Sequence, residues 1–237
     1  MKILAIIPAF NEEKTVVKVI KEVKKELPRC DVLVVNDGSR DKTKEKVEKE
    51  SIDLINLPYN LGIGAAVQTG FIFAKENNYD LAFQIDADEQ HLANQIKKII
   101  KPIQEKKADV IIGSRFLGKN SFNYSFTRRL GILIFQLTHQ LLLGKKITDS
   151  TSGFRAYNKK TINFLAQNYA DDYPEPEAVI KLIKNGFKVI EVFVRMQSRK
   201  QGSSSISSLN SFYYMIKVLL AIGIQSLQKS KLYNERS

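Results

Sequence analysis

Residues 81–91 read LAFQIDADEQH, and this stretch changes from apolar to acidic within a few positions. Its apolar half, Leu81–Ile85, has the length of a buried strand, and two carboxylates, Asp86 and Asp88, follow directly. Like charges this close together are costly unless a cation holds them. Carboxylate and amide oxygens suit Mg²⁺ or Mn²⁺. The stretch therefore predicts a strand that ends in a divalent-metal site, with a solvated acidic turn as the alternative.

The same order of apolar run and polar turn recurs through the first 115 residues. Four further runs have strand length, and amphipathic segments such as Thr15–Leu27 separate them; the runs are Ile3–Ile7, Val32–Val35, Ile52–Leu57 and Val110–Ile112. This alternation predicts an α/β fold, a mostly parallel sheet with helices on both faces. Ligands of such sheets bind beyond the carboxyl ends of the strands, where these polar turns are expected.

Three of the polar turns have two interpretations each. Asn11, in Pro8-Ala9-Phe10-Asn11-Glu12-Glu13, fits a helix N-cap, although a cap leaves the tight turn before it unexplained. Asp37, in Asn36-Asp37-Gly38-Ser39, fits either a cap or a carboxylate facing the imide or ribose of a nucleotide. Asn60-Leu61-Gly62-Ile63-Gly64 fits a tight turn or a phosphate-binding helix start.

Composition limits the cellular setting and the partners. A chain of 237 residues can form one substantial domain, and a lone cysteine, Cys30, is typical of a reducing compartment. The net charge of +12 favours anionic partners, but no basic groove motif studded with aromatic residues indicates nucleic acid. No apolar run is long enough to span a membrane. Leu209–Leu227, however, is expected to form an amphipathic helix lying on a membrane surface, or else a core helix or dimer contact.

Taken together, these segments resemble family 2 glycosyltransferases of the GT-A fold, in the dolichol-phosphate mannose synthase-like branch. Two more marks are Gly113-Ser114-Arg115 and Ser152-Gly153-Phe154-Arg155. A third is Arg199 with Gly202 and Ser204, although Ser205 stands where the family pattern has a lysine. The resemblance implies a GT-A, Rossmann-like glycosyltransferase domain at residues 1–205. The remaining 206–237 would form the membrane-interface helix and basic tail.

The resemblance also implies a role for individual residues. Asp86, Asp88 and Gln90 would bind Mg²⁺ or Mn²⁺. Arg115, with Arg128 or Arg129, would face phosphate groups of the donor or acceptor. The expected catalytic residues are Asp88, Arg115 and Arg199, and the expected residues around the nucleotide are Pro8, Ala9, Glu12, Asp37, Gly64 and Asp86.

The expected activity is that of an inverting glycosyltransferase. It would move a sugar from a nucleotide sugar, UDP-glucose or UDP-N-acetylglucosamine, to a polyprenyl phosphate of the cell envelope. We expect a cytoplasmic protein, peripheral on the inner face of the cell membrane, with a small membrane protein or a second copy as possible partners. The alternatives are a transferase extending a cell-wall saccharide or protein-linked glycan, a non-catalytic nucleotide-sugar binding protein, and a nucleotidyltransferase. A sugar hydroxyl acceptor needs a carboxylate base, for which the candidates are Asp149, Asp171, Asp172, Glu175 and Glu177.

Overall fold

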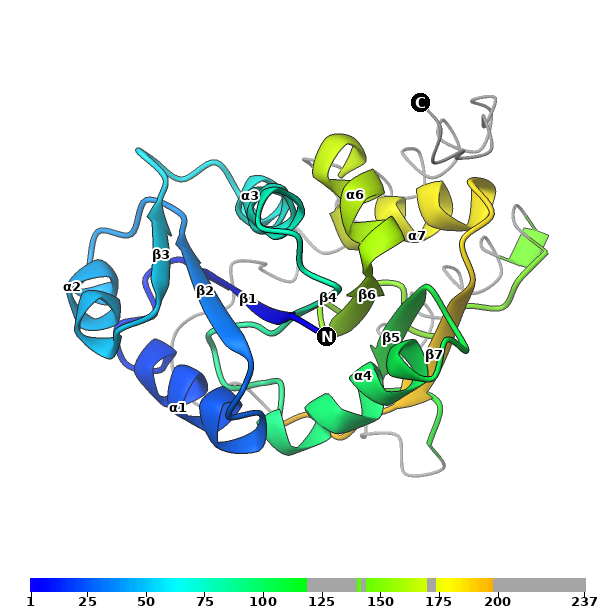
Figure 1. The fold of residues 1–237 in the computed structure, drawn as a ribbon, viewed down its shortest axis with the longest axis horizontal. Coiled ribbons are helices and arrows are strands. Elements are labelled where there is room, and N and C mark those ends of the chain that lie inside the picture. The colour runs from blue at the N-terminus through cyan, green and yellow to red at the C-terminus, as the bar shows by residue number, and fades with distance from the viewer. Residues whose placement is uncertain (119–139, 142–143, 170–173, 198–237) are drawn as a thin grey trace, which may run out of the picture.

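The computed structural model is a layered α/β fold built on one sheet (Figure 1). It describes residues 1–118, 140–141, 144–169 and 174–197. Seven strands form the sheet in the order β3-β2-β1-β4-β6-β5-β7. Their bounds are β1 Ile3–Ala9, β2 Asp31–Asn36, β3 Asp53–Asn56, β4 Leu81–Gln84, β5 Val110–Ser114, β6 Arg155–Asn158 and β7 Val189–Phe193.

The sheet is mostly parallel, as predicted, with one reversed strand. β1 pairs in parallel with β2 and β4, and parallel pairs also join β2 to β3 and β5 to β7. β6 lies between β4 and β5 and is antiparallel to both. The five apolar runs of the first 115 residues are thus confirmed as strands.

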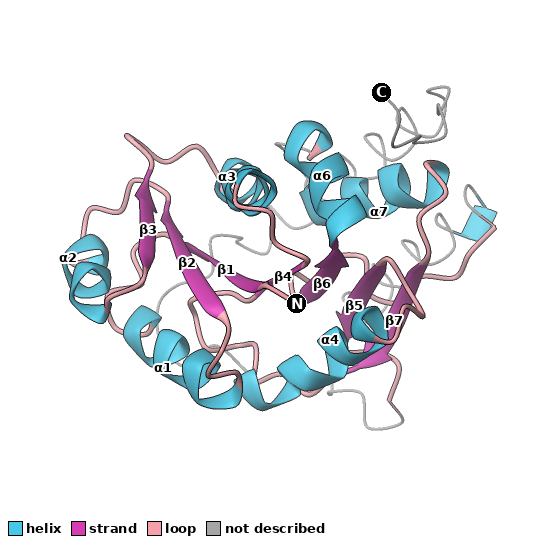
Figure 2. Ribbon diagram, in the orientation of Figure 1, coloured by secondary structure: helices cyan, strands magenta, loops and turns pink. Residues whose placement is uncertain are grey.

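Helices cover both faces of the sheet (Figure 2). Their bounds are α1 Val16–Glu26, α2 Thr43–Val47, α3 Ile63–Glu76, α4 Ile96–Gln104, α6 Lys159–Asn168 and α7 Pro174–Lys184, with 3-10 turns at Glu48–Glu50 and Ala93–Gln95. Successive side chains of a strand point to opposite faces. Ala5 and Ile7 of β1 therefore pack in the core beneath α1 and α4, whereas Leu4 and Ile6 pack in the core beneath α3, α6 and α7.

The predicted C-terminal helix and the domain boundary at residue 205 lie outside the described residues. Within the part of the chain that the structure describes, no helix has the length and apolar character needed to cross a membrane.

Candidate active site

The strand register brings the polar turns together at one edge of the sheet. Ala9 pairs with Asn36 and Ser114 with Phe193, so β1, β2, β5 and β7 all end there. The reversed strand β6 starts at the same edge, because Arg155 pairs with Gln84 at the end of β4. The expectation that the motifs after the strands meet at the carboxyl edge is confirmed.

The acidic turn after β4 is held in shape by its own side chains. The backbone N–H of Gln90 donates to Asp88 Oδ1 at 3.0 Å, and the N–H of Asp86 donates to His91 Nδ1 at 3.0 Å. Burial lowers the pKa of His91 to about 4, so the ring is neutral at pH 7. Because Nδ1 accepts, Nε2 carries the proton, 3.7 Å from Asp86 Oδ2. His91 also stacks on Phe154, with ring centroids 5.0 Å apart.

Two flanking elements clamp this turn. Glu89 has a backbone φ of 65° and a buried carboxylate, which pairs with Lys18 of α1. Beyond β7, Gln197 donates its backbone N–H to Gln90 O at 3.0 Å and its side-chain amide to Glu89 O at 2.7 Å. The turn is therefore fixed between α1 and the segment after β7.

The donor set of the turn fits a hard divalent cation. The described ranges contain no group of three or more His, Cys, Asp or Glu side chains placed so that they could hold a metal ion together, so the fit is judged for a smaller set of ligands. The predicted ligands are two carboxylates and the amide of Gln90, and Mg²⁺ binds through one or two carboxylates together with substrate phosphates. The side chain of Asp86 is 32% exposed, so a ligand can reach it. Beside it, Gln84 Oε1 is buried without a hydrogen-bond partner among the described residues.

The turn after β1 differs from the predicted helix cap. α1 begins at Val16, with Thr15 before it, so Asn11 is not its N-cap. Asn11 instead has a φ of 56°, donates its backbone N–H to Ser39 Oγ at 2.9 Å, and accepts the N–H of Arg40 on its side-chain oxygen at 2.8 Å. Asn11 thus ties the first two polar turns together, which explains the tight turn that a cap did not.

Three other residues expected around the nucleoside, Pro8, Ala9 and Glu12, belong to the same stretch, and a fourth, Gly64, lies in α3. Pro8 and Ala9 are buried at the end of β1, and Gly64 is buried in the first turn of α3. Glu12 accepts the hydroxyl of Thr15 at 2.8 Å.

Asp37 is engaged by the protein itself. Its buried carboxylate accepts the backbone N–H groups of Leu61 at 2.7 Å and Gly62 at 2.9 Å. The predicted helix cap is wrong, because α2 begins at Thr43 with Lys42 before it and no side chain caps it. Asp37 instead holds the loop that leads into α3.

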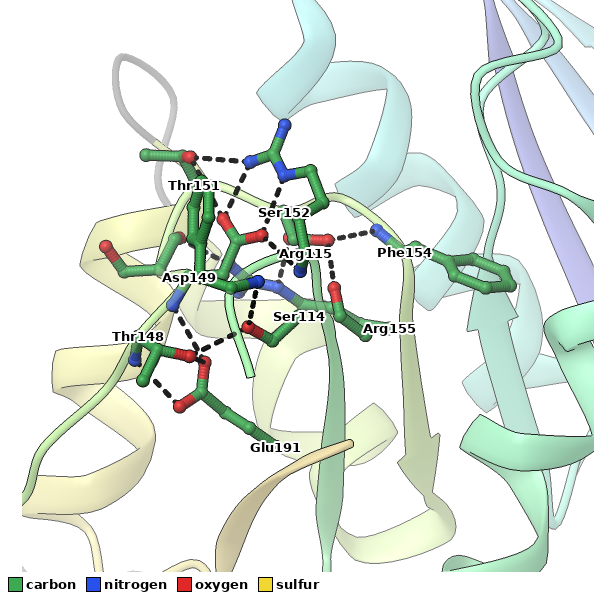
Figure 3. Close-up of polar contacts among 12 residues, drawn as sticks. Ser114, Arg115, Thr148, Asp149, Thr151, Ser152, Phe154, Arg155 and Glu191 are labelled. Atoms are coloured by element: carbon green, nitrogen blue, oxygen red, sulfur yellow. Dashed lines mark hydrogen bonds and ion pairs between the residues drawn. The ribbon is translucent and has the colours of Figure 1, made fainter. Parts of the chain in front are cut away.

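Arg115 follows β5 and pairs with Asp149 (Figure 3). Nε and Nη2 of Arg115 each donate to the Asp149 carboxylate at 2.7 Å, and its backbone N–H adds a third bond at 3.0 Å. Glu191 of β7 accepts from the backbone N–H groups of Thr148 and Asp149, and its burial raises the pKa of its carboxyl. Asp149 is completely buried, which argues against its candidacy as a base.

Arg155 is a structural residue whose role the sequence did not reveal. The side chain is fully buried and donates to three carbonyl oxygens, those of Ser150 and Ser152 at 2.6 Å and of Glu175 at 2.9 Å. It fastens the loop before β6 to the start of α7. The Ser152–Arg155 motif was visible in the sequence, but no pattern indicated which carbonyl groups the arginine would meet.

Part of the predicted site belongs to other stretches of the chain. Arg199, Gly202, Ser204 and Ser205 lie outside the described residues, as do Arg128, Arg129, Asp171 and Asp172.

Comparison with known proteins identifies the family. The sequence profile of glycosyl transferase family 2 matches residues 4–165. The chain belongs to this family. It is 30% identical to a UDP-N-acetylglucosamine–dolichyl-phosphate N-acetylglucosaminyltransferase of Methanococcus voltae, over 90% of this chain and 94% of that protein. It is 27% identical to an undecaprenyl-phosphate mannosyltransferase of Micrococcus luteus, over 87% of this chain and 88% of that one.

Solved structures support the fold. A glucosyl-3-phosphoglycerate synthase from Mycobacterium tuberculosis, solved with Mn²⁺, UDP and phosphoglyceric acid, superimposes with a TM-score of 0.74. The match covers 97% of this chain and 80% of that one at 16% identity, so it shows a shared GT-A fold. The predicted fold class is confirmed.

Proposed function

We propose that this protein transfers a sugar from a nucleotide sugar to a polyprenyl phosphate. The observation that carries the proposal is the similarity, over about nine-tenths of both chains, to the Methanococcus voltae enzyme, whose acceptor is dolichyl phosphate. The relatives named above differ in the sugar that they transfer, so the proposal leaves the sugar open. UDP-glucose and UDP-N-acetylglucosamine are the first donors to test.

The site offers groups for both ends of such a reaction. Asp86, Asp88 and Gln90 would hold Mg²⁺ or Mn²⁺, which neutralises a pyrophosphate leaving group when bound. Arg115 lies at the same edge of the sheet and would orient a phosphate group through its guanidinium. Inversion at the anomeric carbon would follow from attack by the acceptor on the face opposite the leaving group.

A phosphate acceptor also suits the carboxylates that the structure describes. A phosphate monoester is largely ionised at neutral pH, since its second pKa is near 6, so it needs no strong base. Asp149 is occupied by Arg115 and is completely buried, so it is a poor base. The protein would then act at a membrane surface, on the face where the nucleotide sugar is available.

A saccharide acceptor is the second candidate, and Glu175 is the observation that favours it. Glu175 is partly exposed at the start of α7. Burial raises the pKa of its carboxyl, Arg155 opposes this, and the charge of Asp86 raises it further. The pKa of Glu175 is thus raised in part by the charge of Asp86, a predicted metal ligand. A carboxylate with a raised pKa has a property expected of a general base for a sugar hydroxyl.

Transfer of radiolabelled sugar into a lipid extract tests the proposal. A panel of nucleotide sugars is supplied with Mn²⁺ or with EDTA, using wild type, Asp88→Ala and, as a matched control, the exposed Asp53→Ala. We expect label in a lipid that mild acid hydrolyses, lost with EDTA and in Asp88→Ala but kept in the control. Release of nucleotide without labelled lipid would instead support the saccharide acceptor, and Glu175→Gln should then abolish transfer.

A further inference from the structure

The protein holds the Arg115 side chain in a defined orientation. Three hydrogen bonds from Nε and Nη2 contribute to this, two to Asp149 and one to Thr151 at 3.1 Å. A planar guanidinium bound side-on in this way has its plane and direction fixed, which a single ion pair would not achieve.

The buried partner of this pair depends on a second carboxylate. Glu191 Oε1 accepts the hydroxyl of Thr148 at 2.9 Å and the N–H of Asp149 at 2.8 Å, while Oε2 accepts the N–H of Thr148 at 2.7 Å. Figure 3 shows the resulting order: Glu191 below, the 148–149 segment above it, and Arg115 above Asp149. The hydroxyl of Thr148 also lies 2.7 Å from Ser114 Oγ, which ties the segment to the end of β5.

The guanidinium end of this series is the more exposed end. The Arg115 side chain is 18% exposed, whereas that of Asp149 is 0% exposed. Arg115 follows β5 and the acidic turn follows β4, and β6 pairs with the ends of both strands at Arg155, so the two lie at the same edge of the sheet. An ion pair with a purely structural role would need neither a partly exposed arginine nor a position at the carboxyl edge.

We propose that Glu191 is a positioning residue: by fixing Thr148 and Asp149, it orients Arg115 toward a phosphate group bound at the carboxyl edge of the sheet. The inference rests on the proposed function, because that function supplies the phosphate. The phosphate belongs either to the nucleotide-sugar donor or to the polyprenyl phosphate acceptor.

A double-mutant cycle between Glu191→Gln and Arg115→Lys tests this role. Glutamine keeps the shape of Glu191 but presents an amide N–H₂ to one of the backbone donors, so the 148–149 segment should shift. We expect Glu191→Gln to lower kcat/KM by roughly 10-fold in the wild-type background and by less than about 2-fold when Arg115 is already lysine. Glu50→Gln, which alters a surface carboxylate paired with Lys21, is the matched control.

The source of the phosphate follows from two titrations. A loss confined to KM for the nucleotide sugar assigns Arg115 to the donor, and a loss confined to KM for a short-chain polyprenyl phosphate assigns it to the acceptor. Equal losses from Glu191→Gln in both backgrounds would show a general structural role and overturn the proposal. So would full activity of Glu191→Gln alongside an impaired Arg115→Lys.

The test also covers two cases in which the first measurement fails, namely misfolding of Glu191→Gln and the absence of labelled lipid with wild type. If Glu191→Gln fails to fold, as judged by thermal melting, Thr148→Val removes only the hydroxyl bonds and enters the same cycle. If wild type labels no lipid, the proposed function fails separately. The cycle is then measured on the affinities for UDP with Mn²⁺ and for isoprenyl monophosphate, where coupling supports the positioning role and additivity in both overturns it.

Discussion

Replacing Asp37 with asparagine should destabilise the protein even when no nucleotide is present. The carboxylate is buried and accepts two backbone N–H groups, at 2.7 and 2.9 Å. Asparagine has the same shape but only one acceptor oxygen. Its amide group must face either the N–H of Leu61 or that of Gly62, and that donor is left unsatisfied.

The size of the effect follows from these two bonds. Hydrogen bonds to a charged group contribute about 1.5–3 kcal/mol each, and an unsatisfied buried donor costs about 1–3 kcal/mol. One bond is lost and the other becomes neutral, so we expect a loss of about 3 kcal/mol in the free energy of unfolding. For a chain of this length that corresponds to a fall of roughly 6–12 °C in Tm.

Urea unfolding of the nucleotide-free protein measures this change, with Asp53→Asn as the control. Asp53 is exposed on β3, and its substitution should leave the unfolding curve unchanged within about 0.5 kcal/mol. If Asp37→Asn unfolds like wild type but loses nucleotide binding, the carboxylate faces the nucleotide rather than the loop before α3. The reasoning from the two backbone bonds would then be refuted.

Three other substitutions or probes report on separate features. Gly153→Ala would place a Cβ 2.8 Å from Gln84 Nε2 and 3.3 Å from Asp86 Oδ1, a predicted metal ligand. We expect the Mn²⁺ concentration needed for half-maximal transfer to rise by at least roughly 10-fold. An unchanged Mn²⁺ titration would contradict the close packing. Burial raises the pKa of the Cys30 thiol to about 12, so at pH 8 a thiol reagent should modify native protein about 10³-fold more slowly than urea-unfolded protein, and equal rates would refute the burial. Gly38 has a φ of +65°, and a Cβ added there would lie only 2.4 Å from the backbone of Tyr59. Gly144 has a similar φ but open space around it. The Tm of Gly38→Ala should therefore fall below that of Gly144→Ala.

The sequence allowed the parallel half of the sheet to be predicted because its signals are local. Apolar runs of strand length alternate with amphipathic segments, and both patterns are visible within a dozen residues. The reversal of β6 has no such signal. Its direction depends on where the chain re-enters the sheet after leaving β5, and no local pattern encodes that point.

The roles of charged side chains were harder to predict than their location. Asp37 was expected at the carboxyl edge and Asp149 was a candidate base, and both have structural partners at that edge. Their partners are 24 or more residues away along the chain, at Leu61 and Arg115, so a carboxylate with a structural partner could not be distinguished from one awaiting a substrate. Asn11 was misinterpreted for the same reason, because its partners belong to the next polar turn.

The reversed strand has an evolutionary consequence. Since β6 runs backward, the chain leaves β5 at Ser114 and returns at Arg155 on the same edge of the sheet. Both ends of the intervening sequence are therefore anchored at the carboxyl edge, where the polar turns meet. A change in the length of the sequence between Ser114 and Arg155 could therefore alter this edge without changing the direction or register of any of the seven strands.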